Sequence, residues 1–375
     1  MSRIFLSAPH ISGREQELVS EVFDSNYVAP TGEMLSRFEK DVSDYCGIEH
    51  AVALCSGTAA IHLALLILGL GRGDEVWTSS MTFIGGASPI TYVGATPVFF
   101  DLSEKTWGID TDLLKDSLAT AAKDNSLPKA IIPTDLYGQA ADLDAIMELA
   151  RTYGVSVISD SAEALGAFAE GKHAGKGADA TVFSFNGNKI ITTSGGGMLL
   201  SDDQSFIDKA RYLSTQARQP VTHYEHTEIG FNYRLSNVSA AIGVGQLECL
   251  EEKISRRRSI FDRYVKELAN IDQLKFMPEP EGYRSTRWLS CAVYDGQDTK
   301  AYLTRLYSLC EQAEIEIRPL WKPMHMQPVF AGSTFVGTGV CEKLFEIGVC
   351  LPSGSGMTES EQSRVIEVIQ QAVDS

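Results

Sequence analysis

Residues 51–68 read AVALCSGTAAIHLALLIL, an apolar run that passes through Ser56, Gly57 and Thr58 into an apolar segment of helical length. This pattern predicts a buried strand, a turn and a helix. Further short apolar runs alternate with segments of helical period up to about residue 200: EVWTS (75–79), PVFFD (97–101), KAIIPT (129–134), VSVISD (155–160), ATVFSF (180–185) and GMLLS (197–201). The alternation predicts an α/β fold with a mostly parallel sheet covered by helices on both faces.

The rest of the chain indicates a second, smaller unit. A long helical stretch is expected over residues 238–268, and its basic segment KISRRRS (253–259) is typical of a solvated helix face. Beyond it, an α+β pattern is indicated by strands at 287–295 and 315–321 and by helices at 303–313 and 361–373. We predict a large domain over residues 1–250 and a small one over 251–375, with the first 30 residues, including a helix near 13–24, packing on the small domain.

Composition excludes several classes of function. The 375 residues contain 49 acidic and 32 basic side chains, a net charge of -17 that disfavours nucleic acids and anionic membrane surfaces. The N-terminus lacks a secretory signal pattern, and the longest apolar run, interrupted by His62, is too short to cross a bilayer. Seven scattered cysteines without a CxxC pair fit neither a disulfide framework nor a zinc cluster. His223 and His226 lack a third ligand, so we expect no metal. The cysteine pattern makes a reducing cytoplasm the expected location.

The turn at Ser56, Gly57 and Thr58 is a candidate phosphate site. Amides at a helix N-terminus, hydroxyls and a glycine that permits close approach together suit a phosphate group. A simple helix cap would need the same residue types. It is not a Walker A motif, because no GK[ST] follows.

Two further residues extend this candidate site. Asp160 ends a predicted buried strand, where a carboxylate needs a cationic or hydrogen-bonding partner, although it could also cap a turn. Lys189 lies in TVFSFNGNKIITTSGGGMLL (181–200); it could be a surface lysine, but desolvation at a sheet edge would make it a Schiff-base nucleophile. An opposing aspartate can bind the protonated pyridine nitrogen of pyridoxal phosphate. Together the three features predict one pyridoxal phosphate site at the carboxyl edge of the sheet.

A larger set of motifs points to a family. In chain order they are SGTAA (56–60), DLYG (135–138), SDSAEALG (159–166), FSFNGNK (183–189), TTSGGGML (192–199), GFNYRLSN (230–237) and AAIGVGQLE (240–248). The set covers essentially the whole chain and resembles the DegT-type family of pyridoxal phosphate-dependent sugar aminotransferases. The resemblance implies the aspartate aminotransferase (type I) fold and a homodimer with a composite active site.

Other segments resemble one subgroup of this family. They are FLSAPH (5–10), SNYVAPTGE (25–33), STQAR (214–218), HYEH (223–226), RPLWKPMH (318–325) and CLPSG (350–354). The subgroup makes the UDP-linked bacillosamine precursor. It uses L-glutamate to aminate C4 of a UDP-linked 4-keto-6-deoxy-N-acetylglucosamine in a ping-pong reaction. The resemblance therefore implies a UDP-sugar and glutamate as substrates, for bacillosamine-type sugar, glycan or lipopolysaccharide biosynthesis.

The resemblance also assigns residue roles. Lys189 would form the internal aldimine with the cofactor and later move the proton between cofactor and sugar carbons. Asp160 would bind the pyridine nitrogen, and Glu163 would lie near the phenolic oxygen, where many relatives have Gln or His. The other cofactor contacts would be Gly57, Thr58 and Ser184 at the phosphate, Phe83 on the ring and Asn232 at the phosphate of the neighbouring subunit. Candidates for contacting nucleotide, sugar or glutamate carboxylate are Asn26, Tyr27, Arg234, Trp321 and His325.

Three alternatives stay open from the residues. A GDP-perosamine-type C4 aminotransferase or a TDP-sugar C3 aminotransferase would share these motifs, and a non-catalytic sensor could bind pyridoxal phosphate on the same fold. Sugar 3-dehydratases of the family carry histidine in place of the lysine, so Lys189 argues against that branch. A nicotinamide oxidoreductase is disfavoured because no GxGxxG follows the first strand and the glycine turn precedes a strand.

Overall fold

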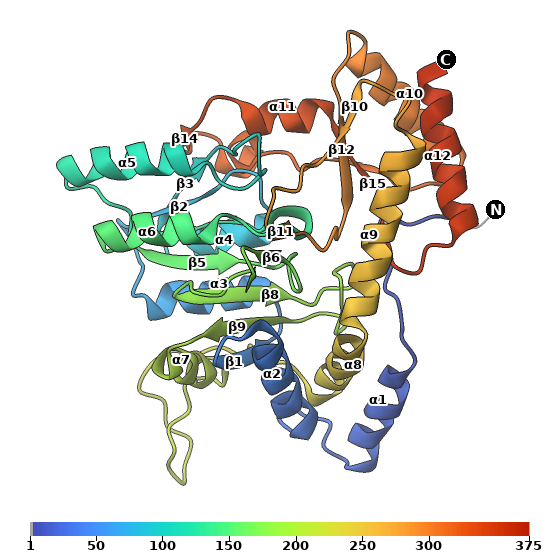
Figure 1. The fold of residues 1–375 in the computed structure, drawn as a ribbon. Coiled ribbons are helices and arrows are strands. Elements are labelled where there is room, and N and C mark those ends of the chain that lie inside the picture. The colour runs from blue at the N-terminus through green and yellow to red at the C-terminus, as the bar shows by residue number, and fades with distance from the viewer. Residues whose placement is uncertain (1–2, 375) are drawn as a thin grey trace.

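The computed structural model describes residues 3–374, whose largest β-sheet has the strand order β1-β9-β8-β5-β4-β2-β3-β14 (Figure 1). Its strands are β1 (His50–Leu54), β2 (Glu75–Ser79), β3 (Thr96–Phe100), β4 (Ala130–Ile132), β5 (Ser156–Asp160), β8 (Ala180–Ser184), β9 (Gly197–Ser201) and β14 (Phe335–Val336). Strand β9 runs antiparallel to both neighbours, and the other pairs are parallel. The predicted α/β fold with a mostly parallel sheet is confirmed.

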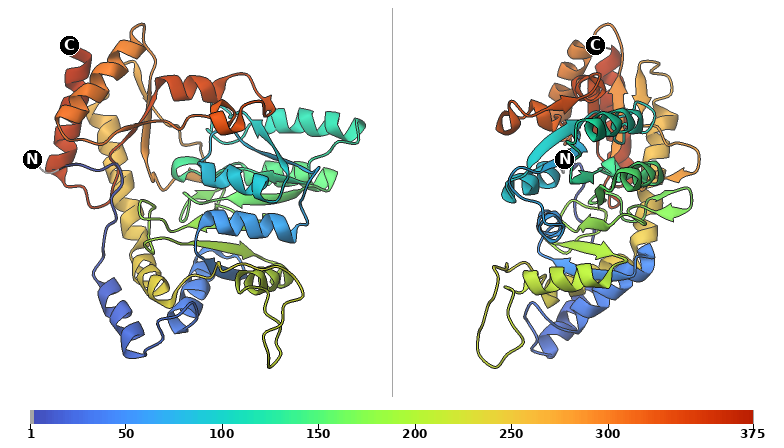
Figure 2. Two further views of the ribbon diagram at one scale, coloured as in Figure 1. Left: turned by 180° about the vertical axis from the view of Figure 1, so that it is seen from behind. Right: turned by 90° about the vertical axis from the view of Figure 1, so that its left-hand side faces the viewer.

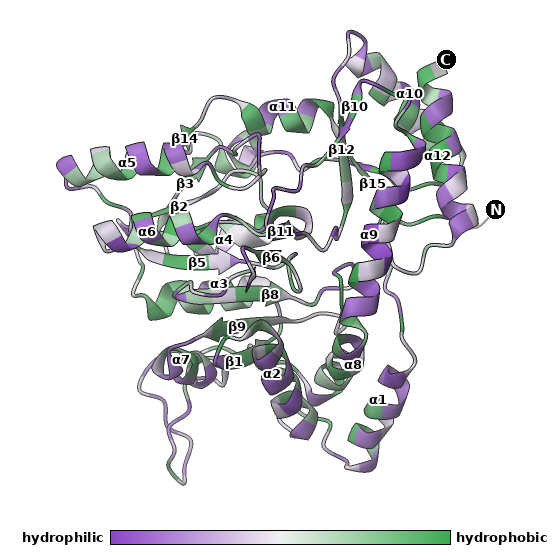
Figure 3. Cartoon of the chain, viewed as in Figure 1, coloured by the Kyte–Doolittle hydropathy of each residue, from purple (hydrophilic) through white to green (hydrophobic). Residues whose placement is uncertain are grey.

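Helices cover both faces of this sheet. They include α2 (Glu33–Cys46), α3 (Gly57–Ile67), α4 (Ile84–Tyr92), α5 (Thr111–Lys123), α6 (Leu143–Tyr153), α7 (Gln204–Ser214) and α8 (Asn237–Glu248), with the 3-10 turn η1 (Leu136–Gly138). Helix α1 (Arg14–Asp24) packs on α8. Successive strand residues point to opposite faces. Val76 accordingly packs in an apolar cluster with α3 and α7, whereas Trp77 packs in another with α5 and α6. Figure 3 shows apolar residues along the strands and polar residues on the outer sides of the helices.

A smaller antiparallel sheet follows, with the order β10-β12-β15-β13. Its strands are β10 (Leu274–Phe276), β12 (Ser290–Tyr294), β13 (Arg318–Pro319) and β15 (Gly348–Leu351), and the helices of this part are α9 (Leu250–Glu267), α10 (Thr299–Gln312), α11 (Val340–Ile347) and α12 (Glu359–Asp374), with the 3-10 turns η2 (Met324–Met326) and η3 (Pro328–Phe330). Ile4 packs in the apolar cluster of this sheet, whereas α1 packs against α8. The domain boundary between residues 250 and 251 stays a prediction.

The basic segment 253–259 is not the solvated face that its charge predicts. The expected helix over 238–268 divides at Cys249 into α8 and α9, and Lys253 and Arg257 of α9 are 3% and 1% exposed. Lys253 donates to the carbonyl oxygen of His10, and Arg257 donates to two backbone carbonyl oxygens and one serine hydroxyl. That prediction was wrong for these two residues, because other parts of the chain cover this side of the helix.

Two small connections complete the architecture. Strands β11 (Tyr283–Arg284), β6 (Phe168–Ala169) and β7 (Lys172–His173) form a three-stranded sheet in that order. Strand β14, from the C-terminal part of the chain, pairs with β3 of the large sheet. Beside it, the Asp101 carboxylate accepts backbone hydrogen bonds from the four residues 338–341 at the start of α11. The C-terminal part is therefore held directly to the end of β3, next to the carboxyl edge of the large sheet.

His173 of β7 is a buried imidazole whose neutral form satisfies both ring nitrogens. Its Nε2 accepts a hydrogen bond from the amide of Gly166 at 2.8 Å, and its Nδ1 donates to the carbonyl oxygen of Ala174 at 2.8 Å. Burial lowers the pKa of His173 to about 4, from the ordinary 6.5. Because the folded state then binds this proton more weakly than the unfolded state, stability rises with pH between about 4 and 6.5.

We expect this imidazole to cost the protein about 2 kcal/mol of unfolding free energy when the pH falls from 7.5 to 5. In His173→Gln, the amide can donate and accept the same hydrogen bonds without titrating, so its loss over this interval should be about 2 kcal/mol smaller. Urea unfolding of both proteins at the two pH values measures the difference. The same pH dependence in both would contradict the prediction.

Candidate active site

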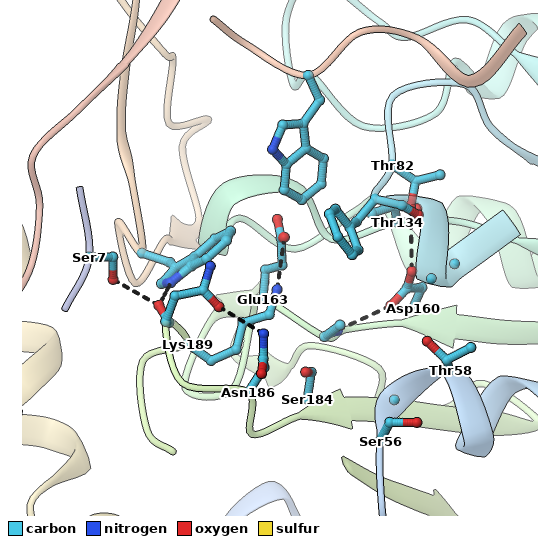
Figure 4. A pocket seen from close by; sticks show the side chains of 18 of the residues that line it. Ser7, Ser56, Thr58, Thr82, Thr134, Asp160, Glu163, Ser184, Asn186 and Lys189 are labelled. Atoms are coloured by element: carbon cyan, nitrogen blue, oxygen red, sulfur yellow. Dashed lines mark hydrogen bonds and ion pairs between the residues drawn. The ribbon is translucent and has the colours of Figure 1, made fainter. Parts of the chain in front are cut away.

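A cavity of about 480 Å³ lies at the carboxyl ends of β5 and β8, beside the start of α3 (Figure 4). Residues from the N-terminal segment and the small sheet also line it, so it forms where the two parts of the chain meet. Eight of the residues to which the resemblance assigns a cofactor or substrate contact line this cavity: Gly57, Thr58, Phe83, Asp160, Glu163, Ser184, Lys189 and Trp321. The structure therefore brings together residues that are up to 264 positions apart, from Gly57 to Trp321.

The start of α3 is the candidate phosphate cradle predicted from the sequence. Ser56 has an extended backbone, and its Oγ accepts the Ala59 amide at 3.0 Å, which caps the helix. The amides of Gly57 and Thr58 lie in the first turn, where a helix offers donors without intrahelical acceptors. A Cβ on Gly197 would lie 2.3 Å from the Gly57 nitrogen, so only glycine allows β9 to approach here. Ser56 therefore caps the helix and the turn lines the cavity, whereas the phosphate role of this turn stays a prediction.

Asp160 ends β5 with its carboxyl group in the cavity wall. Its Oδ1 accepts the Ala162 amide at 3.3 Å, and its Oδ2 accepts the Thr82 hydroxyl at 3.5 Å, so both partners are uncharged. A Cβ on Gly86 would lie 2.6 Å from Oδ2, which explains the glycine there. Burial raises the pKa of Asp160, and the charge of Lys189 opposes that rise. This buried acid is arranged to receive a cationic ligand atom.

Lys189 and Glu163 form a buried ion pair across the cavity. Lys189 Nζ lies 3.0 Å from Glu163 Oε1, and the two side chains are 11% and 3% exposed. Glu163 Oε2 accepts the Tyr137 amide at 2.8 Å, which fixes the carboxylate. Burial raises the pKa of Glu163 to about 7, against the opposing effect of Lys189. An amine and a carboxyl group in this arrangement can exchange a proton near neutral pH.

These groups fit pyridoxal phosphate. The cradle suits its phosphate, the buried Asp160 suits its protonated ring nitrogen, and the Lys189 amine suits its aldehyde carbon. The cavity also contains Phe83 and Trp321, whose ring centroids are 5.7 Å apart, as an apolar wall for a planar ring. Within residues 3–374, no group of three histidine, cysteine, aspartate or glutamate side chains is placed to hold a metal.

Two predicted substrate residues are engaged elsewhere in the structure. Arg234 is half-buried, and its guanidinium donates to Glu39 at 2.6 Å and to the carbonyl oxygen of Ala53 at 3.0 Å. His325 bonds Ser80 Oγ at 2.7 Å and Glu342 at 3.1 Å. Neither lines the cavity, because both side chains satisfy buried or half-buried polar partners of their own chain. The structure does not place either residue in the site.

Asn26, Tyr27 and Asn232 also lie outside this cavity. Tyr27 borders a shallow groove between α1 and α2, with Asn26 next to it in a left-handed conformation. Asn232 pairs with Thr215 at the base of a long loop between α7 and α8 that projects from the body (Figure 2). The roles of all three stay predictions, and that of Asn232 involves the neighbouring subunit.

Sequence reasoning missed several lining residues, among them Ser7, Thr82, Asn188, Trp288, Glu316 and Arg318. Trp288 is the most consequential, since its ring centroid lies 4.2 Å from Lys189 Nζ. A tryptophan inside a predicted strand is typical of ordinary core, so no local pattern marks it. Only its position in the fold identifies it.

Comparisons with known proteins identify the family of this chain. The profile of the DegT/DnrJ/EryC1/StrS aminotransferase family matches residues 9–370. The chain is 50% identical to EpsN of Bacillus subtilis (strain 168), whose name marks it as a candidate pyridoxal phosphate-dependent aminotransferase, over 98% of this chain and 95% of that protein. It is 37% identical to the GDP-perosamine synthase of Caulobacter vibrioides, over 100% and 99% of the two chains.

Solved structures share the fold. The aminotransferase TlmJ from Streptoalloteichus hindustanus superposes with a TM-score of 0.89 at 30% identity, over 99% of both chains. This agreement confirms the expected type I fold. No helix within residues 3–374 is long and apolar enough to cross a membrane. The chain belongs to the DegT/DnrJ/EryC1/StrS aminotransferase family.

Proposed function

We propose that this chain moves the amino group of L-glutamate to C4 of a nucleotide-linked 4-keto-6-deoxy sugar. It is a transaminase of a family whose cofactor is pyridoxal phosphate. The observation that carries the proposal is the Lys189 amine, 3.0 Å from Glu163 Oε1 in the same buried cavity as Asp160 and the phosphate cradle. An amine, a partner for a cation and an anion cradle in one cavity are the three groups that bind and use this cofactor.

Each group has a defined task in this reaction. The amides of Gly57 and Thr58 and the hydroxyl of Ser184 bind the phosphate, and the Asp160 carboxylate binds the ring nitrogen in its protonated form. When bound, the cofactor supplies an electron sink that acidifies the neighbouring substrate C–H bond. Lys189 Nζ would hold the aldehyde carbon, and as a free amine it would accept and return the proton of the substrate carbon.

Glu163 supports the proton transfers at Lys189. Its carboxylate holds the protonated amine at 3.0 Å, and a pKa of about 7 allows it to take up that proton at working pH. The backbone of Tyr137 prevents the carboxylate from rotating away.

Two nucleotides are candidates for the acceptor. The UDP-linked N-acetylated sugar is supported by the segments that resemble the bacillosamine subgroup, such as SNYVAPTGE (25–33) and RPLWKPMH (318–325). The GDP-linked sugar is supported by the similarity to GDP-perosamine synthases over the whole chain, at 37% identity for the Caulobacter protein. We favour the UDP-linked sugar, because the segments that resemble the bacillosamine subgroup include Tyr27 and Trp321, to which the resemblance assigns substrate contacts.

We also propose a homodimer with a composite active site. The loop between α7 and α8 carries Tyr224 and Ile229 at 79% and 86% exposure, which an isolated chain would leave in water. This loop ends near Asn232, the residue expected to reach the neighbouring phosphate. A dimer would cover these side chains and bring Asn232 to the second cradle. A cytoplasmic location stays a prediction.

A titration in one cuvette tests the function. The protein is loaded with pyridoxal phosphate, and its visible absorption is recorded before and after L-glutamate and then after each keto sugar. We expect the visible band to bleach with glutamate and to return with the UDP-linked 4-keto-6-deoxy-N-acetylglucosamine. Return with only a GDP- or TDP-linked sugar would keep the enzyme class and overturn the UDP preference. Binding of the cofactor without bleaching would indicate a sensor.

A further inference from the structure

The carbonyl group that precedes Lys189 is held by two side chains from distant parts of the chain. Ser7 Oγ donates to the carbonyl oxygen of Asn188 at 2.8 Å, and Trp288 Nε1 donates to the same oxygen at 2.7 Å. Asn188 and Lys189 share this peptide group, so its orientation sets the direction in which the Lys189 side chain leaves the backbone. Figure 4 shows Ser7 reaching toward the loop that carries Lys189.

Both donors are in turn fixed by Arg257 of α9. Arg257 is 1% exposed. Its Nη1 donates to the carbonyl oxygen of Trp288 and, at 3.1 Å, to that of Ser353. Its Nη2 donates to Ser7 Oγ at 3.0 Å. No carboxylate is among these partners, and burial lowers the pKa of Arg257 to about 10. A guanidinium can make these divergent bonds because its donors lie in a rigid plane, whereas a lysine ammonium cannot.

Trp288 also contacts the reacting amine directly. The centre of its indole ring lies 4.2 Å from Lys189 Nζ, on which Glu163 Oε1 also acts at 3.0 Å. The ammonium form of Lys189 therefore sits between a carboxylate and an aromatic face, which both stabilise it. Any rotation of the Trp288 side chain would alter both its hydrogen bond to the Asn188 carbonyl oxygen and its contact with Lys189 Nζ.

We propose that Ser7 and Arg257 are positioning residues that act through Asn188 and Trp288 to hold Lys189 Nζ beside Glu163. This inference rests on the proposed function, because it gives Lys189 the role of amine and proton carrier. The set joins the N-terminal segment, α9 and the loop after β8. Loss of one of these hydrogen bonds should therefore displace the Lys189 amine rather than weaken the binding of substrate.

The test compares Ser7→Ala and Arg257→Lys with Arg256→Lys. Arg256 lies on the same helix and donates to the carbonyl oxygen of Met357 at 2.8 Å. Arg256→Lys therefore removes a similar guanidinium contact that is not connected to Lys189. We expect kcat to fall roughly tenfold in Ser7→Ala and more in Arg257→Lys, with the KM for the nucleotide sugar changed less than about twofold. Arg256→Lys should keep the parent kcat.

A second readout does not depend on turnover. The rate at which added pyridoxal phosphate reacts with cofactor-free protein is followed by visible absorption across pH. Because a displaced Lys189 ammonium loses its contacts with Glu163 and Trp288, the pH profile of this rate should differ between Ser7→Ala and the parent. An unchanged pH profile and an unchanged kcat, even with a lower melting temperature, would overturn the positioning role.

The two proposals fail differently. Borohydride reduction and mass spectrometry of the parent protein show whether the cofactor attaches at Lys189. Attachment elsewhere or nowhere would overturn the proposed function, and the positioning role with it. If the cofactor attaches at Lys189 and Ser7→Ala keeps the parent kcat and pH profile, the positioning role alone is overturned. If Arg257→Lys does not fold, Ser7→Ala decides the matter, since it removes a single hydroxyl.

Discussion

The Lys189→Arg variant should lose at least about 10⁴-fold in amino transfer, the largest effect that we expect from one substitution. A guanidinium stays protonated at every working pH, so it can neither attack an aldehyde carbon nor accept a proton from carbon. The substitution keeps a positive charge beside Glu163, so loss of the ion pair cannot account for the result. Formation of 2-oxoglutarate from L-glutamate in the presence of the keto sugar measures the rate.

A matched control separates this effect from a general response to arginine. Lys176 pairs with Asp202 at 2.8 Å at the protein surface, and Lys176→Arg should leave turnover within about twofold of the parent. Lys189→Arg should still bind pyridoxal phosphate, because the cradle at Gly57 and Thr58 is untouched. Near-normal turnover of Lys189→Arg would show that another residue carries the amine chemistry.

The Asp160→Asn variant is expected to lose roughly 10²- to 10³-fold in kcat. An amide has nearly the same shape as the carboxyl group but cannot carry the negative charge that keeps a pyridine nitrogen protonated. The electron sink would therefore weaken while the cavity keeps its shape. Single-turnover bleaching of the visible band by L-glutamate measures this step without the sugar half-reaction.

The cofactor-free Asp160→Asn variant should be at least as stable as the parent, although its activity falls. Asp160 is 4% exposed and has only uncharged hydrogen-bond partners, so its ionised form is costly in the cofactor-free protein. The amide of Asp160→Asn carries no such cost, and the melting temperature of the cofactor-free variant should equal or exceed that of the parent. The control is Asp142→Asn at the start of α6, where asparagine caps the helix equally well and activity should not change. A stable Asp160→Asn enzyme with full activity would contradict the assigned role.

The cofactor part of the site could be predicted from the chain alone because its residues follow local rules. Ser56 to Thr58 lie between an apolar strand and a helix, and Asp160 and Lys189 follow buried strands. Carboxyl ends of parallel strands meet at one edge of a sheet, so strand assignment already placed these groups together. The alternation of apolar residues likewise predicted the large sheet, since each buried strand must face a helix on both sides.

The surroundings of Lys189 were decided by tertiary structure. Ser7, Arg257 and Trp288 meet around Asn188 across separations of 31 to 250 residues, and none of them carries a local signature. The basic charge of residues 253–259 predicted solvent exposure, yet Arg257 is buried because the N-terminal segment and the small sheet close over that side of α9. Helical period shows which residues share a face, but only long-range packing determines which part of the chain covers that face.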